Sequence, residues 1–256
     1  MTPGPRRPGR WEETLFTVCH MFVSLDGKID GDFFAAPEAA PALAAYGALR
    51  EDYRCQAILY GTTTMLGGFA DGPAPRLPRQ GAPLAKEDSV NPQGRRMGQF
   101  VVSVDPKGSL AFSGPVLERR GRPAAHVIQA VTEQVDPAYL AYLRQVGVSY
   151  LFAGKEQLDC PLLLEKLAAR FGVQRLMVAG GGVVNWSFLQ AGCVDEVSLV
   201  VAPVADGSTT AVSSFERGGF LPNHGPVALS LAEAKPLAGD GLWLRYTARG
   251  KERTAP

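Results

Sequence analysis

The chain has 256 residues, 46% of them hydrophobic and 20% charged, and its formal net charge is +1. This size and composition fit one large α/β domain, and the near-neutral charge gives no electrostatic basis for binding nucleic acid or an anionic membrane surface. No apolar run reaches the length of a membrane-spanning helix, and residues 1–10 lack the apolar core of a secretory signal.

We therefore expect a cytoplasmic protein with a single domain at residues 14–249, between a disordered arm at 1–13 and a tail at 250–256. The cysteines are scattered singly, without a C-x-x-C pair or a metal-ligand spacing, which predicts buried thiols in a reducing compartment. They are Cys19, Cys55, Cys160 and Cys193. The histidines lie far apart in the sequence, so no metal site is predicted.

Strand-like and helix-like segments alternate along most of the chain. An apolar, partly β-branched run at 15–25 predicts a buried strand, and apolar residues near helical spacing predict a helix within 37–54. Further strands are predicted at 57–60, 100–104, 125–130 and 148–153. Residues 71–99 are rich in Pro, Gly and Arg and have no period, which predicts a long irregular insertion.

The second half continues the alternation. Asp159 or Cys160 as cap, Pro161 at the first position and Gly172 after the end predict a helix at 161–171. A strand at 176–179, a helix at 183–191, a strand at 197–204 and an antiparallel pair at 227–233 and 242–248 follow. Strands with little polar alternation imply an α/β fold, with a mostly parallel central sheet, helices on both faces and a C-terminal antiparallel hairpin.

The most informative stretch is the junction after the strand at 176–179, where three glycines lead into a helix. Glycines let a ligand phosphate approach the backbone N–H groups, and the helix N-terminus favours an anion. The pattern is not G-x-G-x-x-G, so a tight strand–helix connection without a ligand is the alternative interpretation. The candidate phosphate-binding residues are Gly180, Gly181, Gly182, Val183, Val184 and Asn185.

Glycines, hydroxyls, lysines and two aspartates also follow the other predicted strands. In open parallel sheets the ligand lies beyond the carboxyl ends of the strands, so these residues predict a phosphate-bearing cofactor at one edge of the sheet. They are Ser24, Asp26, Lys28, Gly61, Thr62, Thr64, Asp105, Gly154 and Lys155. In the irregular insertion, Arg76 and Arg79 are candidates for holding an anionic substrate, with ordinary surface charge as the alternative.

Three segments resemble the reductase domain of the bacterial riboflavin-biosynthesis deaminase–reductase, in the dihydrofolate-reductase-like group. The first is Val23-Ser24-Leu25-Asp26-Gly27-Lys28-Ile29, and the second is Leu49-Arg50 followed by Ala57-Ile58-Leu59-Tyr60-Gly61-Thr62-Thr63-Thr64. The third runs from Leu176 through the paired glycines, Ser187-Phe188-Leu189 and Val194-Asp195-Glu196 to Ala202-Pro203. The resemblance implies a dihydrofolate-reductase-like fold, NADPH as hydride donor, a small-molecule substrate and a homodimer.

The resemblance also implies roles for individual residues. The turn from Gly181 to Ser187 would hold the cofactor pyrophosphate, and Thr64 with the region of Val104 and Asp105 would contact the adenosine phosphates. Phe22 and Ser24 would flank the nicotinamide. Cations for a 2′-phosphate are Lys107, Arg119, Arg120 and Lys155, which the sequence does not rank.

The sequence departs from the family where the substrate binds. The family's glutamate before the paired glycines is Ala179 here, and its Asp-Asn-Pro-x-Leu-x-Arg-like run is replaced by Leu66–Asp71 and a proline-rich stretch, in which Arg76 or Arg79 would stand in. No zinc-deaminase signature precedes this region. The first hypothesis is therefore an NADPH-dependent reductase of a conjugated C=N or C=C bond in a small heterocycle, resembling 5-amino-6-(5-phosphoribosylamino)uracil reductase but with an altered substrate pocket.

Two alternatives stay open, a true riboflavin-pathway pyrimidine reductase and a non-catalytic NADPH-binding protein. For the reductases, Asp26 and Lys28 are the candidate proton sources because both lie on the turn after the first strand. A plain Asp-Gly turn and a solvated lysine are the competing interpretations. Asp30 is a candidate substrate contact, with loop charge as the alternative.

Overall fold

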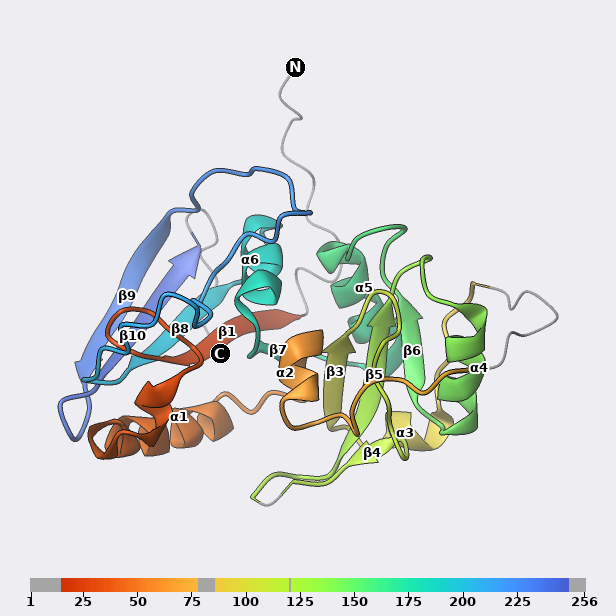
Figure 1. Ribbon diagram of the computed structural model, residues 1–256, viewed down its shortest axis with the longest axis horizontal. Coiled ribbons are helices and arrows are strands. Elements are labelled where there is room, and N and C mark those ends of the chain that lie inside the picture. Colours follow the sequence, from red (N-terminus) through yellow and green to blue (C-terminus); the bar gives the residue numbers. More distant parts are fainter. Residues whose placement is uncertain (1–14, 78–85, 120, 249–256) are drawn as a thin grey trace.

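The computed structural model describes residues 15–77, 86–119 and 121–248 (Figure 1). The predicted arm at 1–13, the tail at 250–256 and Arg79 lie outside the described residues. Four cysteines lie within them, all as free thiols, and three of these are buried as predicted while Cys55 is half-buried. No described helix is both long and apolar enough to cross a membrane.

One sheet of ten strands organises the described part of the chain, with the order β4-β5-β3-β2-β7-β1-β8-β10-β9 and β6 pairing with β5. The strands are β1 (Phe16–Val23), β2 (Ala57–Gly61), β3 (Phe100–Val104), β4 (Val116–Leu117), β5 (Ala125–Val131), β6 (Ser149–Phe152), β7 (Arg175–Val178), β8 (Glu196–Val201), β9 (Leu229–Pro236) and β10 (Leu242–Ala248). The central pairs are parallel, whereas β10 runs antiparallel to β8 and β9. The predicted α/β class and C-terminal hairpin are confirmed.

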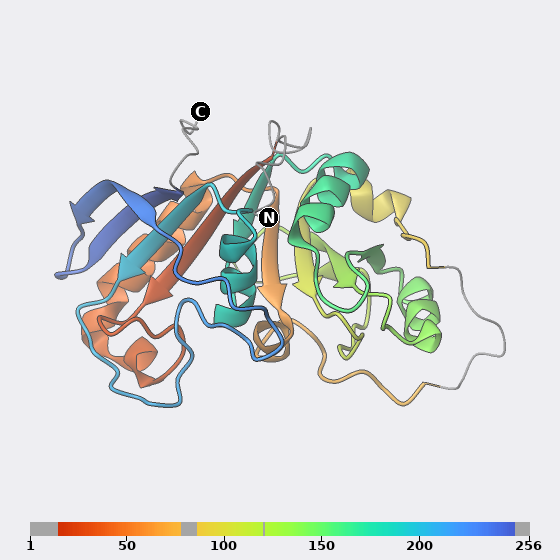
Figure 2. The ribbon, with the colours of Figure 1, turned by 90° about the horizontal axis from the view of Figure 1, so that it is seen from above.

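Helices cover both faces of the sheet (Figures 1 and 2). The helices are α1 (Ala40–Asp52), α2 (Thr62–Leu66), α3 (Pro92–Arg96), α4 (Pro137–Gln145), α5 (Cys160–Phe171) and α6 (Gly182–Gln190), with short 3-10 turns at Asp32–Ala35 and Pro37–Ala39. The apolar sides of α5 and α6 pack on one face, and α1 and α4 pack on the other. The near-continuous burial of the central strands explains why their sequences lack polar alternation.

The sequence analysis assigned no range to α2, α3, α4 and β4. α4 is capped by Asp136, whose carboxylate accepts the N–H of Ala138 at 2.8 Å, and Pro137 occupies its first turn. α3 lies inside the segment predicted to be irregular and is capped by Asn91, which accepts the N–H groups of Gln93 and Gly94. β4 has two residues and therefore no readable period.

Two buried histidines sit on the sheet as core residues. His20 bonds Ser198 Oγ at 2.9 Å and the Tyr46 carbonyl at 3.1 Å, while His126 bonds Ser149 Oγ at 2.7 Å. Burial lowers the pKa of each imidazole from 6.5 to about 4. Both rings are therefore neutral at physiological pH. Separately, no cluster of potential metal ligands occurs in the described ranges.

Candidate active site

The carboxyl ends of four central strands meet at one edge of the sheet. β7 pairs with β1 on one side and β2 on the other, and β2 pairs with β3. The turns that follow these strands therefore lie next to one another, and they carry Ser24, Gly61, Asp105 and the glycines after β7. Gly154 is farther away, because β6 lies beyond β5.

The glycine turn after β7 leaves the start of α6 uncapped by any side chain. Gly181 is the N-cap residue, with φ 76°, and no side chain bonds to the first turn of the helix. The N–H groups of Gly182, Val183 and Val184 have no intrahelical acceptor, as at any helix start. Together with the helix dipole, these N–H groups suit an anionic oxygen.

The glycines of this region differ in how much space a side chain would have. A Cβ on Gly180 would lie 2.9 Å from Thr64 Oγ1, and one on Gly61 would lie 2.8 Å from Val184 Cγ2. A Cβ on Gly182 would lie 2.3 Å from the Ser213 carbonyl oxygen. Beside Gly181 the nearest atom is Thr64 Oγ1 at 3.9 Å. Tight packing thus accounts for three of the glycines, whereas a Cβ on Gly181 would meet only Thr64 Oγ1, at an ordinary contact distance, with open space on its other sides.

Of the three threonines that follow β2, Thr62 and Thr64 differ in their surroundings. Thr62 Oγ1 donates to the Val104 carbonyl at 2.9 Å, and this bond ties the ends of β2 and β3 together. Thr64 Oγ1 borders the open space at Gly181 instead. Asn185 is buried, and its side-chain amide donates to the Ser214 carbonyl at 2.8 Å. Of these candidates, Thr64 is the side chain whose hydroxyl lies beside the glycine turn.

Ser24 and Asp26 organise the loop after β1. Ser24 Oγ donates to Asp26 Oδ1 at 2.6 Å and accepts the Lys28 N–H at 2.9 Å. The Asp26 carboxylate also accepts the N–H groups of Asp206 and Gly207 at 2.9 and 3.0 Å. These hydrogen bonds hold the pKa of Asp26 far below its usual range. Asp26 is therefore ionised at neutral pH and has no proton to donate.

Lys28 lies on the same loop, but its side chain is not held by comparable hydrogen bonds among the described residues. Its backbone bridges to Ser213, and no hydrogen bond or ion pair of its ammonium group occurs among the described residues. Nearby, Asp30 is exposed, and its carboxylate accepts the N–H of Gly31 at 2.9 Å. Phe22 is buried against Phe33, with a distance of 5.4 Å between ring centroids. Among these residues Lys28 carries the free polar group.

Two predicted cofactor contacts serve the protein's own backbone. Asp105 is 2% exposed, and its carboxylate accepts the N–H groups of Ser109 and Leu110 at 2.6 and 3.0 Å. Gly154 has φ 120°, and a Cβ there would lie 2.0 Å from the Gln157 carbonyl oxygen. Backbone geometry therefore explains both residues without a ligand, and their predicted role in cofactor binding stays untested.

The predicted substrate residues are spread out. Ala179 lies on the same face of the sheet as Tyr60 and is 9% exposed. Arg76 is exposed, on a stretch that runs beside residues 109–111 through hydrogen bonds such as Ala74 N–H to the Ser109 carbonyl. The structure thus does not bring Arg76 to the glycine turn by any described contact.

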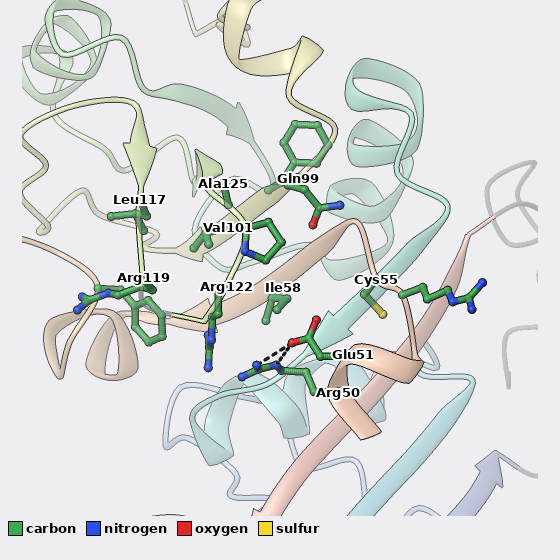
Figure 3. Close-up of a pocket in the computed structure, with 14 residues that line it drawn as sticks. Arg50, Glu51, Cys55, Ile58, Gln99, Val101, Leu117, Arg119, Arg122 and Ala125 are labelled. Carbon is green, nitrogen blue, oxygen red and sulfur yellow. Dashed lines mark hydrogen bonds and ion pairs between the residues drawn. The ribbon is translucent and has the colours of Figure 1, made fainter. Parts of the chain in front are cut away.

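A pocket of about 280 Å³ opens on the face of the sheet that carries α1 (Figure 3). Its floor includes Ile58 and Val101, and the ring of Phe69 lines one side. Arg50, Arg54, Arg119 and Arg122 also line it. Sequence reasoning left this pocket out, although Leu49-Arg50 was part of the family resemblance and Arg119 was a candidate for a phosphate contact.

Comparison with known proteins identifies relatives along nearly the whole chain. The protein-family model described as the RibD C-terminal domain matches residues 16–241. The 2,5-diamino-6-ribosylamino-4(3H)-pyrimidinone 5′-phosphate reductase of Methanothermobacter thermautotrophicus is 30% identical over 239 residues, which cover 92% of this chain and 99% of that protein. The protein of the same name from Archaeoglobus fulgidus is 26% identical over 206 residues, with coverage of 79% and 88%.

Solved structures show the same fold. A pyrimidine reductase-like protein from Corynebacterium diphtheriae has a TM-score of 0.64 and 17% identity, covering 93% of each chain. The riboflavin biosynthesis reductase Rib7 of Saccharomyces cerevisiae has a TM-score of 0.59 and 17% identity, covering 95% of this chain and 93% of that one. At this identity the likeness supports the architecture and leaves the chemistry to other observations.

Proposed function

Because the chain belongs to the RibD C-terminal domain family, we propose that it is an NADPH-dependent reductase of riboflavin biosynthesis. Its substrate would be a ribosylaminopyrimidine 5′-phosphate. The observation that carries the proposal is the relation to the Methanothermobacter reductase, at 30% identity over 99% of that protein. The comparisons favour this alternative over a reductase with an altered substrate pocket, although Ala179 still departs from the family pattern.

The residues at the strand ends fit the coenzyme. The open space at Gly181 and the uncapped start of α6 suit the pyrophosphate, and Thr64 Oγ1 borders the same space. When bound, NADPH supplies a hydride to an electron-poor carbon of the substrate. The chain's contribution is to orient the two molecules and to exclude water. Asp105 and Gly154 are not needed in this arrangement.

Hydride transfer to a C=N bond also requires a proton. Since Asp26 is ionised and already accepts three hydrogen bonds, we assign it to positioning the loop after β1. Lys28, on the same loop, is the proposed proton source at the nitrogen that accumulates charge. The ammonium group can donate and be reprotonated from solvent, because Lys28 is half-exposed.

A homodimer is the proposed assembly. On β10, Leu244 pairs with Leu199 of β8, and Tyr246 pairs with Leu231 of β9. Leu231 is 58% exposed. Such a continuous apolar stripe favours an interface. Mass measurement in solution tests this proposal: Leu231→Glu is expected to give monomers, whereas Val116→Glu, at a 36% exposed position on β4, serves as the control. A dimer that survives Leu231→Glu would contradict it.

The function is tested by following NADPH absorbance with purified protein. The two substrates are the 2,5-diamino-pyrimidinone ribosyl 5′-phosphate and the corresponding 5-amino-uracil, with dihydrofolate as the control. We expect oxidation of NADPH with at least one of the first two. Tight NADPH binding without oxidation by either pyrimidine would instead favour the non-catalytic binding protein, and a yellow purified protein would indicate a flavin enzyme.

A further inference from the structure

The chain between β8 and β9 passes beside α6 and reaches the loop between β6 and α5 (Figures 1 and 2). We call residues 216–221 of this segment the strap. The Glu216 N–H donates to the Gly182 carbonyl at 3.0 Å, and the Gln157 side-chain amide donates to the Phe220 carbonyl at 2.8 Å. The strap is therefore fixed at both ends, and its first end lies on the opening turn of the helix proposed to bind the coenzyme pyrophosphate.

Phe220 presents an aromatic ring beside the first turn of α6. Its ring carbons lie 2.8 and 3.2 Å from a Cβ built on Gly218, and Val183 Cγ1 lies 3.1 Å from the same point. A turn closed by the Leu221 N–H and the Gly218 carbonyl, at 2.9 Å, holds the residue in place. Phe220 is nevertheless 62% exposed. An exposed aromatic ring on a fixed backbone is suited to stacking with a flat heterocycle.

Arg217 supplies a positive charge on the same strap. It is exposed, and no hydrogen bond or ion pair of its guanidinium group occurs within the described part of the chain. The neighbouring Glu216 carboxylate accepts the Ser213 N–H at 2.7 Å, and Glu216 Cγ lies 3.2 Å from a Cβ built on Gly182. A negative charge therefore lies beside the helix start, and an anionic ligand there requires a nearby cation. Arg217, the next residue along the chain, can supply that cation.

The strap extends toward the side of the sheet where the adenosine half of the coenzyme would lie. β7, which leads into α6, pairs with β1 on one side, and β6, which leads into the Gln157 loop, lies on the opposite side beyond β2, β3 and β5. With hydride transfer proposed beside the loop after β1 and the pyrophosphate at the glycine turn, the rest of the coenzyme continues toward β6. Arg217 and Phe220 are three residues apart, so their backbones lie within about 10 Å, close to the length of an adenosine phosphate.

Building on the proposed function, we propose that the strap binds the adenosine half of the coenzyme, with the Phe220 ring stacked on the adenine and Arg217 bound to a phosphate. Arg217 is absent from the cations predicted from the sequence. The pyrophosphate and the 2′-phosphate of NADPH share the same chemistry toward a guanidinium group, so the experiment must separate them.

Dissociation constants for NADPH, NADH and reduced nicotinamide mononucleotide, measured by fluorescence titration, test the stacking role of Phe220. Phe220→Ser should weaken the binding of both dinucleotides by roughly 5- to 100-fold, the range for a base stacked on an aromatic ring. Phe220→Tyr should keep most of the affinity, because it keeps the ring. Affinity for the mononucleotide should not change, since this ligand lacks the adenosine half. Leu43→Ser, at a 36% exposed position on α1, is the matched control.

The same titrations test Arg217. Arg217→Met should lower the affinity for NADPH by roughly 10- to 100-fold, the range for one lost charge-assisted hydrogen bond, and Arg217→Lys should recover part of it. An equal loss for NADPH and NADH assigns Arg217 to the pyrophosphate, whereas a loss confined to NADPH assigns it to the 2′-phosphate. Arg95→Met, at an exposed position of α3, is the matched control and should bind both coenzymes like the wild type.

Unchanged dinucleotide affinity in Phe220→Ser or in Arg217→Met would overturn the proposal. An equal loss of affinity for the mononucleotide would also overturn it, because that result indicates a general disturbance at the start of α6. At saturating NADPH, kcat should keep its wild-type value in all strap variants. If neither pyrimidine is reduced while NADPH binding still depends on Phe220 and Arg217, the proposed function fails and the adenosine site stands.

Discussion

Replacing Gly181 by aspartate tests whether the turn after β7 holds a diphosphate. The new side chain has room, because the nearest atom to a Cβ there is Thr64 Oγ1 at 3.9 Å. A carboxylate about 5 Å from the diphosphate would repel each unit of its charge by about 3 kcal/mol at an effective dielectric constant of about 20. Gly181 is half-exposed, so screening reduces this value, and we expect NADPH affinity to fall roughly 10- to 100-fold.

The control variants separate charge from backbone strain. Gly181 has φ 76°, so Gly181→Ala carries a strain cost without the charge. Gly172→Asp adds a carboxylate at another positive-φ position, φ 68°, remote from the turn. NADPH dissociation constants from fluorescence titration at low and high salt complete the design, since added salt should narrow the gap between the Asp and Ala variants. Equal affinity of Gly181→Asp and Gly181→Ala would refute the reasoning.

The remaining predictions concern packing, pH and the loop after β1. Gly61→Ala should lower the free energy of unfolding by about 1–3 kcal/mol, because the added methyl group would clash with Val184 Cγ2. Adding Val184→Ala to the same chain should recover part of that loss. If denaturant unfolding shows strictly additive effects of the two substitutions, the close approach of these residues is wrong. Because the folded-state pKa of His20 is about 4 and the unfolded value is 6.5, the unfolded chain takes up the proton first as pH falls. His20 stabilisation is therefore complete above pH 6.5 and decreases toward pH 4, by up to about 3 kcal/mol; a His20→Asn variant with the same pH dependence as wild type would argue against this. Lys28→Met should lower kcat with little change in NADPH affinity, whereas Asp26→Asn should chiefly weaken hydrogen-exchange protection of the Asp206 and Gly207 amides. A normal kcat in Lys28→Met would remove Lys28 as the proton source.

The sheet was predictable because its strands are nearly continuous apolar runs that end in glycine or polar residues. The helix that ends before Gly172 was also predictable, since Asp159 accepts the Leu162 N–H as a cap and Gly172 adopts the left-handed conformation. The antiparallel pairing of the terminal hairpin was predictable from the alternation of β10. In each case a local pattern carried the information.

The site residues were harder to predict from the sequence, because their roles depend on neighbours that are distant in the sequence. Asp105 follows a strand, which is typical of a ligand contact, yet its carboxylate accepts the N–H groups of Ser109 and Leu110, four and five residues further along the chain. Arg50 and Arg122 share a pocket, although one lies on a helix and the other after a two-residue strand. Nothing in either local pattern indicates that they meet.

The segment at 212–216 links the two halves of the proposed reaction centre. Ser214 donates to the Gly27 carbonyl on the loop after β1, and its own carbonyl accepts the Asn185 amide on α6. The Glu216 N–H donates to the Gly182 carbonyl at the start of that helix. This short peptide thus connects the start of α6, where the coenzyme is proposed to bind, with the loop that carries Lys28. Inserting or deleting one residue in it would misalign donor and acceptor together, so turnover and coenzyme affinity would decline in step.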